Sequence, residues 1–178
     1  ALHRALDLLE NLLDFARAEA GNLEIKFEEV HIGTIAEQVA EEYRAQAEAN
    51  GLELGVHMPE EIPTIASDGR RIAQILGNLL SNAMKYTDEG SVTVEVKVEE
   101  ERVGVLVRDT GRGISPEDQA RIFQEYFRAS KEEEGAGIGL AISRLLARIL
   151  DGDLAVESAA GEGSTFTLWL PRKGGANA

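Results

Sequence analysis

The chain has no cysteine, only four prolines, one tryptophan and few cations relative to its acids. The lack of cysteine excludes disulfides and thiolate metal sites. No apolar run is long enough to span a bilayer, and no signal-peptide pattern stands at the start. The 18 lysines and arginines face 32 aspartates and glutamates, for a net charge of −14. This balance argues against a nucleic-acid surface, because phosphate contacts need clustered cations.

An anionic ligand must therefore be held by local devices, such as backbone N–H groups, a few cations or a metal. The 178 residues, 43% of them hydrophobic, suit one ordinary globular domain with an appended element. The chain begins in mid-pattern with "ALHRALDLLE" and without an initiator methionine, so we expect a piece of a longer protein. For this piece we expect no nucleic acid, no membrane contact and a cytoplasmic location, whether or not its parent is membrane-anchored.

Hydrophobic spacing predicts an irregular alternation of helices and strands. Helices are expected at residues 2–20, 32–49, from the "SDG" cap at 67–69 to about 85, in "SPEDQARIF" and at 139–150. Strands are expected at 23–30, 52–58, 91–100, 102–109, 154–158 and 164–171, the last four as two hairpins. This order predicts an α+β fold, a two-layer α/β sandwich. Its mixed, mostly antiparallel sheet would be covered by helices on one face and preceded by one N-terminal helix.

The stretch "NLLSNAMKYT", residues 78–87, gives its helix a polar edge. Asn78 and Asn82 are four residues apart, and Lys85 and Tyr86 follow within one turn. All four therefore project from one side of the helix. The neighbouring side has apolar residues at core-facing spacing. The polar stripe is thus either a solvated helix edge or one wall of a cleft.

Two glycine-rich turns follow this helix. "DTGRGI", Asp109 to Ile114, comes directly after an expected strand and by itself indicates a tight turn. "GAGIGL", residues 135–140, precedes a helix whose first N–H groups can face phosphates. A dinucleotide fingerprint would follow a strand, whereas this turn follows "KEEE", so the Rossmann interpretation fails.

In this order and spacing, "NLLSNAMKYT", "DTGRGI", "IFQEYFRAS" and "GAGIGL" resemble the N, G1, F and G2 boxes of sensor histidine kinases. The resemblance is to their C-terminal ATP-binding catalytic domain, which has the GHKL or Bergerat fold. "LENLLDFARAEAGNLEIKFEEV" is similar to the end of the family's dimerisation domain and its linker. The resemblance implies the second dimerisation helix in residues 1–21, the catalytic domain in 22–173 and a tail in 174–178.

The resemblance implies ATP and Mg²⁺ as cofactors. Asn82 would bind Mg²⁺, for which an amide oxygen is a suitable hard ligand. Asn78 would shape the same edge and Lys85 would neutralise phosphate charge, the two together forming the catalytic pair. Asp109 would accept a hydrogen bond from the adenine amino group. The remaining matched binding residues are Tyr86, Gly111, Gly113, Ile114, Arg128 on the lid, Gly137, Ile138, Gly139, Leu140, and Thr165 near an adenine-bound water.

The implied activity is transfer of the ATP γ-phosphoryl group to a histidine on the protein's own dimerisation domain, in a homodimer. A response regulator would then take the group on an aspartate. None of the three histidines has the family's acceptor context, so the acceptor is expected on a first dimerisation helix outside this chain. The first helix has an apolar stripe that is expected to pack in that bundle, at Leu2, Leu6, Leu9, Leu13 and Ala16.

Two alternatives remain open. One is an ATP-driven conformational ATPase of the same fold, although such enzymes use a glutamate base where this chain has Asn78. The other is a nucleotide-binding module without turnover.

Overall fold

The protein was analysed as a computed structural model that describes residues 2–125, 127 and 137–173. Its helices are α1 (Leu2–Glu19), α2 (Ile32–Ala49), α3 (Gly69–Tyr86), α4 (Pro116–Gln119) and α5 (Gly139–Ile149). Its strands are β1 (Glu28–Val30), β2 (Glu53–His57), β3 (Ile65–Ser67), β4 (Ser91–Val98), β5 (Arg102–Asp109), β6 (Asp153–Ala159) and β7 (Gly163–Pro171).

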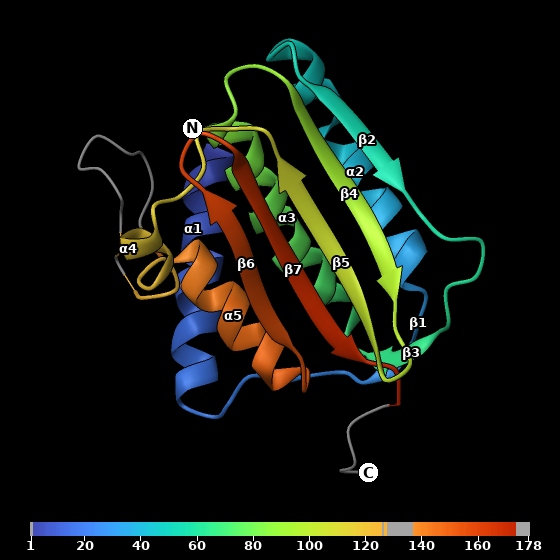
Figure 1. Cartoon of the computed structure of the whole chain (residues 1–178). Coiled ribbons are helices and arrows are strands. Elements are labelled where there is room, and N and C mark those ends of the chain that lie inside the picture. Colours follow the sequence, from blue (N-terminus) through green and yellow to red (C-terminus); the bar gives the residue numbers. More distant parts are fainter. Residues whose placement is uncertain (1, 126, 128–136, 174–178) are drawn as a thin grey trace.

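Five strands form one sheet in the order β2-β4-β5-β7-β6, and β1 pairs with β3 in a separate two-stranded sheet. The β2–β4 pair is parallel because helix α3 connects these strands as a crossover. The other pairs of the main sheet are antiparallel, and β4–β5 and β6–β7 are the two expected hairpins. Helices α2, α3 and α5 pack against the sheet, with α2 and α3 behind it in Figure 1. The predicted two-layer α+β fold is confirmed.

The core lies between the sheet and these helices. Strand β4 alternates buried and less buried positions, and its valines at 92, 94 and 96 face the helices. Helix α3 buries Ile72, Ile75, Leu76 and Leu79 on one stripe, as its sequence period predicts. The packing of this stripe fixes the rotation of α3, and hence where its polar edge lies.

The expected strand at residues 23–30 is wrong over most of its length, since only β1 is a strand. Leu23 and Ile25 pack against the core without a ladder partner, and the backbone N–H of Lys26 donates to Asp68 instead. The alternating hydrophobic pattern before β1 therefore arises because one side of an extended segment packs on the core, and not because the segment pairs with another strand. The partner strand β3 was missed because three residues carry too little periodic signal.

Helix α1 packs beside α5 and contacts the rest of the protein through one face. Phe15 packs against the core, whereas Leu9 and Leu13 of the expected apolar stripe are 53% and 48% exposed. The side chains of Leu2 and Leu6 lie outside the described part. Among the helices described, none combines the length and the hydropathy that a bilayer crossing needs.

Candidate nucleotide-binding site

A cavity of about 290 Å³ lies where the C-terminal end of α3 meets the turn after β5. Its lining combines a buried carboxylate, amide and hydroxyl groups with apolar and aromatic side chains, as small-molecule sites usually do. The lining residues are Asn82, Ala83, Tyr86, Asp109, Arg112, Gly113, Ile114, Ser115, Asp118, Ile122, Phe127, Leu140, Ser164 and Phe166.

The turn after β5 can pack closely against two neighbouring backbone segments because Gly111 and Gly113 have no side chains. A Cβ on Gly111 would overlap the carbonyl oxygen of Tyr86, which accepts the N–H of Arg112 at 3.3 Å. Gly113 has φ +67°, and a Cβ there would overlap the carbonyl oxygen of Ala159. The "DTGRGI" turn is therefore wedged between the end of α3 and the β6–β7 turn, which forms one side of the cavity.

Asp109 ends β5 and is only 7% exposed, with its carboxyl group in the cavity wall. The backbone N–H of Gly111 donates to its Oδ1 at 2.9 Å. Burial raises the pKa of the Asp109 carboxyl, and hydrogen bonds from the backbone N–H groups of Gly111 and Ser164 oppose part of this rise. The structure thus places a buried carboxyl group, held by backbone N–H groups, in the wall of the cavity. Its role as an acceptor for a ligand N–H group stays a prediction.

The polar edge of α3 divides into two parts. Asn82 is half-buried and lines the cavity, and none of the described residues makes a hydrogen bond with its side chain. Asn78, one turn earlier, instead donates to Ser143 Oγ at 3.1 Å and to the carbonyl oxygen of Gly139 at 3.4 Å. The amide of Asn82 is therefore available to a ligand, whereas Asn78 fixes α5 against α3.

Two cations flank the Tyr86 ring at the rim of the cavity. The Lys85 ammonium lies 4.9 Å from the ring centroid and the Arg112 guanidinium 4.6 Å from it. Sequence reasoning selected Lys85 and missed Arg112, although it lies inside the quoted "DTGRGI" motif and its charge was the available signal.

Thr165, the predicted binding residue of β7, lies between two residues that line the cavity. Ser164 and Phe166 of β7 line the cavity, and Thr165 does not. Side chains alternate between the two faces of a strand, so the residue between two cavity-lining positions points to the opposite face. The sequence "GSTF" offers adjacent hydroxyls, and only the register of β7 on β5 decides between them.

The second glycine turn leads into α5. Ile138 is the N-cap residue and forms no side-chain cap hydrogen bond, so the N-cap side chain does not occupy the first N–H groups of α5. Leu140 reaches the cavity, while Gly137, Ile138 and Gly139 stand beside it without lining it. Arg128 lies outside the described residues.

Within the described ranges, no three histidine, aspartate or glutamate side chains are grouped as a metal site. A divalent cation at this cavity would therefore take its ligands from Asn82, water and the ligand's own phosphates. Mg²⁺ commonly binds in this way, with one or two protein ligands. The unengaged amide of Asn82 fits that ion.

Residues 67–174 match the family model described as histidine kinase-, DNA gyrase B-, and HSP90-like ATPase. The chain is 40% identical over 175 residues to the non-motile and phage-resistance protein of Caulobacter vibrioides, covering 93% of this chain and 21% of that protein. It is 32% identical to the sensor histidine kinase RcsC of Salmonella typhimurium, covering 95% of this chain and 18% of RcsC.

The chain thus spans about a fifth of the length of these curated relatives. The structure is also similar to full-length ShkA in complex with AMPPNP, with a TM-score of 0.87 at 34% identity. That match covers 97% of this chain and 37% of ShkA. The histidine kinase AdeS of Acinetobacter baumannii has the same fold, with a TM-score of 0.77 at 22% identity over 93% of this chain and 77% of AdeS. The chain belongs to the family of histidine kinase-, DNA gyrase B- and HSP90-like ATPases, as an ATP-binding domain of the sensor histidine kinase class.

Proposed function

We propose that this chain is the catalytic part of a longer two-component sensor kinase. It binds Mg²⁺–ATP and transfers the γ-phosphoryl group to a histidine on its dimerisation domain, from which a response-regulator aspartate takes it. One observation carries this proposal: a single cavity combines the buried acceptor Asp109 with the unengaged amide of Asn82 and the cations around Tyr86.

The chemistry of the lining orients the nucleotide. Adenine fits the end at Asp109, where its amino group donates to the carboxylate and apolar contacts come from Ile114 and Phe166. The phosphates fit the other end, beside Asn82 and Lys85. The amide oxygen of Asn82 would hold Mg²⁺, which would supply positive charge that offsets the charge of the phosphates.

The protein's own contribution to the reaction is to position the triphosphate and to complement its charge. Asn82 holds the metal, Lys85 neutralises phosphate charge, and the N-terminus of α5 offers N–H groups beside them. Asn78 has no carboxylate to activate water, and its amide is engaged with Ser143 and Gly139. Slow hydrolysis follows, which favours transfer to a protein acceptor over an ATPase cycle.

The acceptor lies outside this chain. His31 precedes α2 and His57 ends β2, and neither lines the nucleotide cavity. We assign α1 as the second dimerisation helix, residues 22–173 as the catalytic domain, and the functional unit as a homodimer. The similarity to ShkA over nearly the whole chain supports a helix joined to the domain in this way.

The first experiment titrates the chain with ATP and GTP, with and without Mg²⁺, by calorimetry. Binding of ATP that strengthens with Mg²⁺ and rejection of GTP are expected. The second experiment extends the chain by a preceding acceptor helix and looks for acid-labile phosphate from labelled ATP. Absence of ATP binding, or Mg²⁺–ATP binding with fast hydrolysis and no phosphohistidine, would refute the assignment.

A further inference from the structure

A row of three polar residues crosses the sheet at the Asp109 end of the cavity. Asp109 on β5 is the register partner of Ser164 on β7, and Ser164 is the partner of Ser158 on β6. Residues directly opposite each other on antiparallel strands place their side chains on the same face of the sheet. Asp109 and Ser164 line the cavity, whereas Ser158 is not among the lining residues. The row therefore runs from the cavity wall to a side chain behind it.

The Ser158 hydroxyl has three close polar neighbours. The backbone N–H of Ile114 donates to Ser158 Oγ at 2.8 Å, and Ser158 Oγ donates to the carbonyl oxygen of Gly163 at 2.7 Å. The third neighbour is Ser164 Oγ, at 3.0 Å. A hydroxyl group has one proton to donate and two lone pairs that accept. The three neighbours therefore use all of its hydrogen-bonding capacity.

The identity of these neighbours fixes the direction of each hydrogen bond. A carbonyl oxygen only accepts, so the proton of Ser158 points at Gly163, and the N–H of Ile114 occupies one lone pair. Ser164 must then donate to the remaining lone pair. If Ser158 donated to Ser164 instead, its oxygen would face the Gly163 carbonyl oxygen at 2.7 Å with no proton between them. The one proton of the Ser164 hydroxyl is thus directed at Ser158 and not at the cavity.

A glutamine side chain holds Ser158 in this position. Gln119 ends α4, and its Nε2 donates to the backbone carbonyl oxygens of Ile114 and Ser158, both at 2.8 Å. Ile114 is the last residue of the "DTGRGI" turn and lines the cavity. Its N–H contacts Ser158 directly and its carbonyl does so through Gln119. The position of Ser158 relative to the cavity wall is therefore fixed from both sides of one peptide unit.

This arrangement determines what the wall offers to a ligand. Ser164 keeps two lone pairs, and within the described ranges its hydroxyl makes no hydrogen bond other than that with Ser158. The neighbouring backbone N–H groups of Gly111 and Ser164 already donate to Asp109. The wall formed by Asp109 and Ser164 can therefore accept hydrogen bonds but not donate them. An amino group on a purine suits this wall, whereas an oxo group finds no donor there.

We propose that Ser158 is a positioning residue for base selection, an inference that rests on the proposed function. By accepting the O–H of Ser164, it makes this end of the cavity a surface of acceptors, which selects a purine with an amino group over one with an oxo group. Ser158 touches no nucleotide and acts through Ser164.

The test titrates the wild-type chain and Ser158→Ala by calorimetry with ATP and with inosine triphosphate, each with Mg²⁺. Inosine triphosphate carries an oxo group in place of the adenine amino group. In Ser158→Ala the Ser164 hydroxyl can turn and donate to that oxo group. The ratio of ATP affinity to inosine triphosphate affinity should then fall at least about fivefold, as expected for two neutral hydrogen bonds at the low end of their usual range. Equal loss of both affinities would indicate a merely structural role and overturns the proposal.

A double-mutant cycle tests whether Ser158 acts through Ser164. Once Ser164→Ala has removed the hydroxyl that Ser158 orients, the further change Ser158→Ala should leave the affinity ratio within about twofold. If Ser158→Ala lowers the ratio by the same factor with and without the Ser164 hydroxyl, the two residues act independently and the proposal fails.

Two conservative variants test the hydroxyl group without an alanine at this position. Ser158→Thr keeps the hydroxyl and should keep the affinity ratio within about twofold of the wild type. Ser158→Cys has only a weak donor and a weak acceptor, so it should lower the ratio. An equal ratio in both variants, or a lower ratio in Ser158→Thr than in Ser158→Cys, contradicts the role assigned to the hydroxyl.

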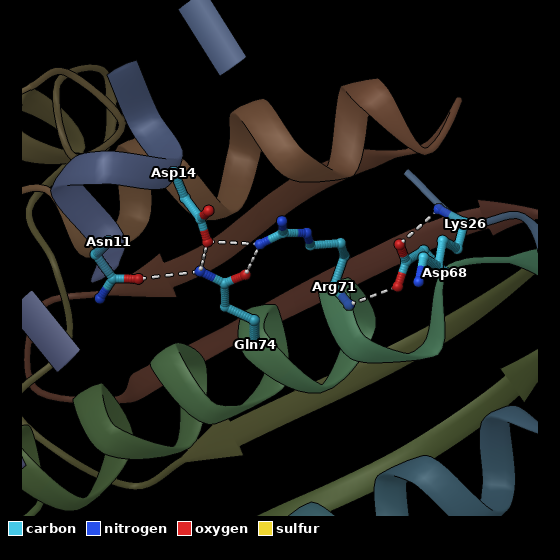
Figure 2. Close-up of polar contacts among 6 residues, drawn as sticks. All are labelled: Asn11, Asp14, Lys26, Asp68, Arg71 and Gln74. Atoms are coloured by element: carbon cyan, nitrogen blue, oxygen red, sulfur yellow. Dashed lines mark hydrogen bonds and ion pairs between the residues drawn. The ribbon is translucent and has the colours of Figure 1, made fainter. Parts of the chain in front are cut away.

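Gln74→Leu is the control for general damage to a hydrogen-bond network. Gln74 lies on α3 outside the cavity lining, and Figure 2 shows its side chain directed at Asn11 and Asp14, to which it donates at 3.1 and 3.2 Å. The variant should melt at a lower temperature with an unchanged affinity ratio, and a ratio that falls as far as in Ser158→Ala overturns the proposal. A wild-type chain that binds no ATP refutes the proposed function. A wild-type chain that prefers ATP, beside an unchanged ratio in Ser158→Ala, refutes only the role of Ser158.

Discussion

Replacement of Asp109 by asparagine probes the base end of the cavity. The carboxylate is 7% exposed, and Gly111 N–H occupies one of its oxygens at 2.9 Å. Asparagine has the same shape and can keep this bond through its amide oxygen, but it offers the adenine amino group no charged acceptor. A hydrogen bond to a charged group contributes about 1.5–3 kcal/mol. ATP affinity should therefore fall about 10- to 150-fold.

The assay is calorimetric titration of both proteins with ATP and GTP at fixed Mg²⁺. The affinity for GTP relative to that for ATP should rise in Asp109→Asn, because the asparagine amide can donate to the guanine oxo group that the carboxylate repels. Asp153→Asn is the control, since Asp153 is about half exposed and does not line the cavity. Wild-type ATP affinity together with undiminished rejection of GTP in Asp109→Asn would refute the assignment of the adenine end.

The raised pKa of Asp109 adds a pH signature with a defined sign. Adenine needs the ionised carboxylate as acceptor, so ATP affinity should fall as the pH drops through the raised pKa, starting at a higher pH than for an ordinary aspartate. Asp109→Asn should lack this fall. The carboxyl group stabilises the fold most below the ordinary aspartate pKa, and this contribution is lost as the pH rises through the raised value. The denaturant midpoint of Asp109→Asn should therefore exceed that of the wild type by the largest amount at neutral pH. A difference between the two midpoints that stays constant across the pH range would contradict the burial argument.

The remaining predictions test other parts of the structure. Asn82→Ala should remove most of the Mg²⁺ dependence of ATP binding while leaving thermal stability nearly unchanged, and a preserved Mg²⁺ effect in titrations would exclude Asn82 as the ligand. Gly113→Ala should lower the free energy of unfolding by more than about 1 kcal/mol, seen as a lower melting temperature. The reason is that its Cβ would overlap the carbonyl oxygen of Ala159 at a positive φ. Gly77→Ala, inside α3 with no neighbour closer than 3.7 Å, should instead stabilise by about 0.5–1 kcal/mol, and equal effects of the two glycine changes would contradict this account. Asp68→Ala should cost about 1 kcal/mol in chemical unfolding through the lost cap of α3, and a smaller loss in Asp68→Ser would identify the cap as the cause.

Helix α3 and the two hairpins were predictable because their signals are local. The Asp68 cap, the apolar period and the hairpin strands each act over a few residues, and the structure reproduces them. The glycines of "DTGRGI" were predictable in the same way, since a turn that approaches another backbone closely needs residues without side chains. The sequence by itself therefore determined most of the helices and strands, the order of the motifs and the class of the site, but not the short strands β1 and β3.

Tertiary structure decided which side chains meet. Ser164 and not Thr165 enters the cavity because β7 has one particular register on β5, and a shift of one residue would exchange the faces. Asp14 meets Arg71 across 57 residues and Asn78 meets Ser143 across 65, distances in sequence over which no periodicity extends. Such contacts depend on how the helices pack on the sheet, and that packing is set by the whole core at once and not by any local stretch of the chain.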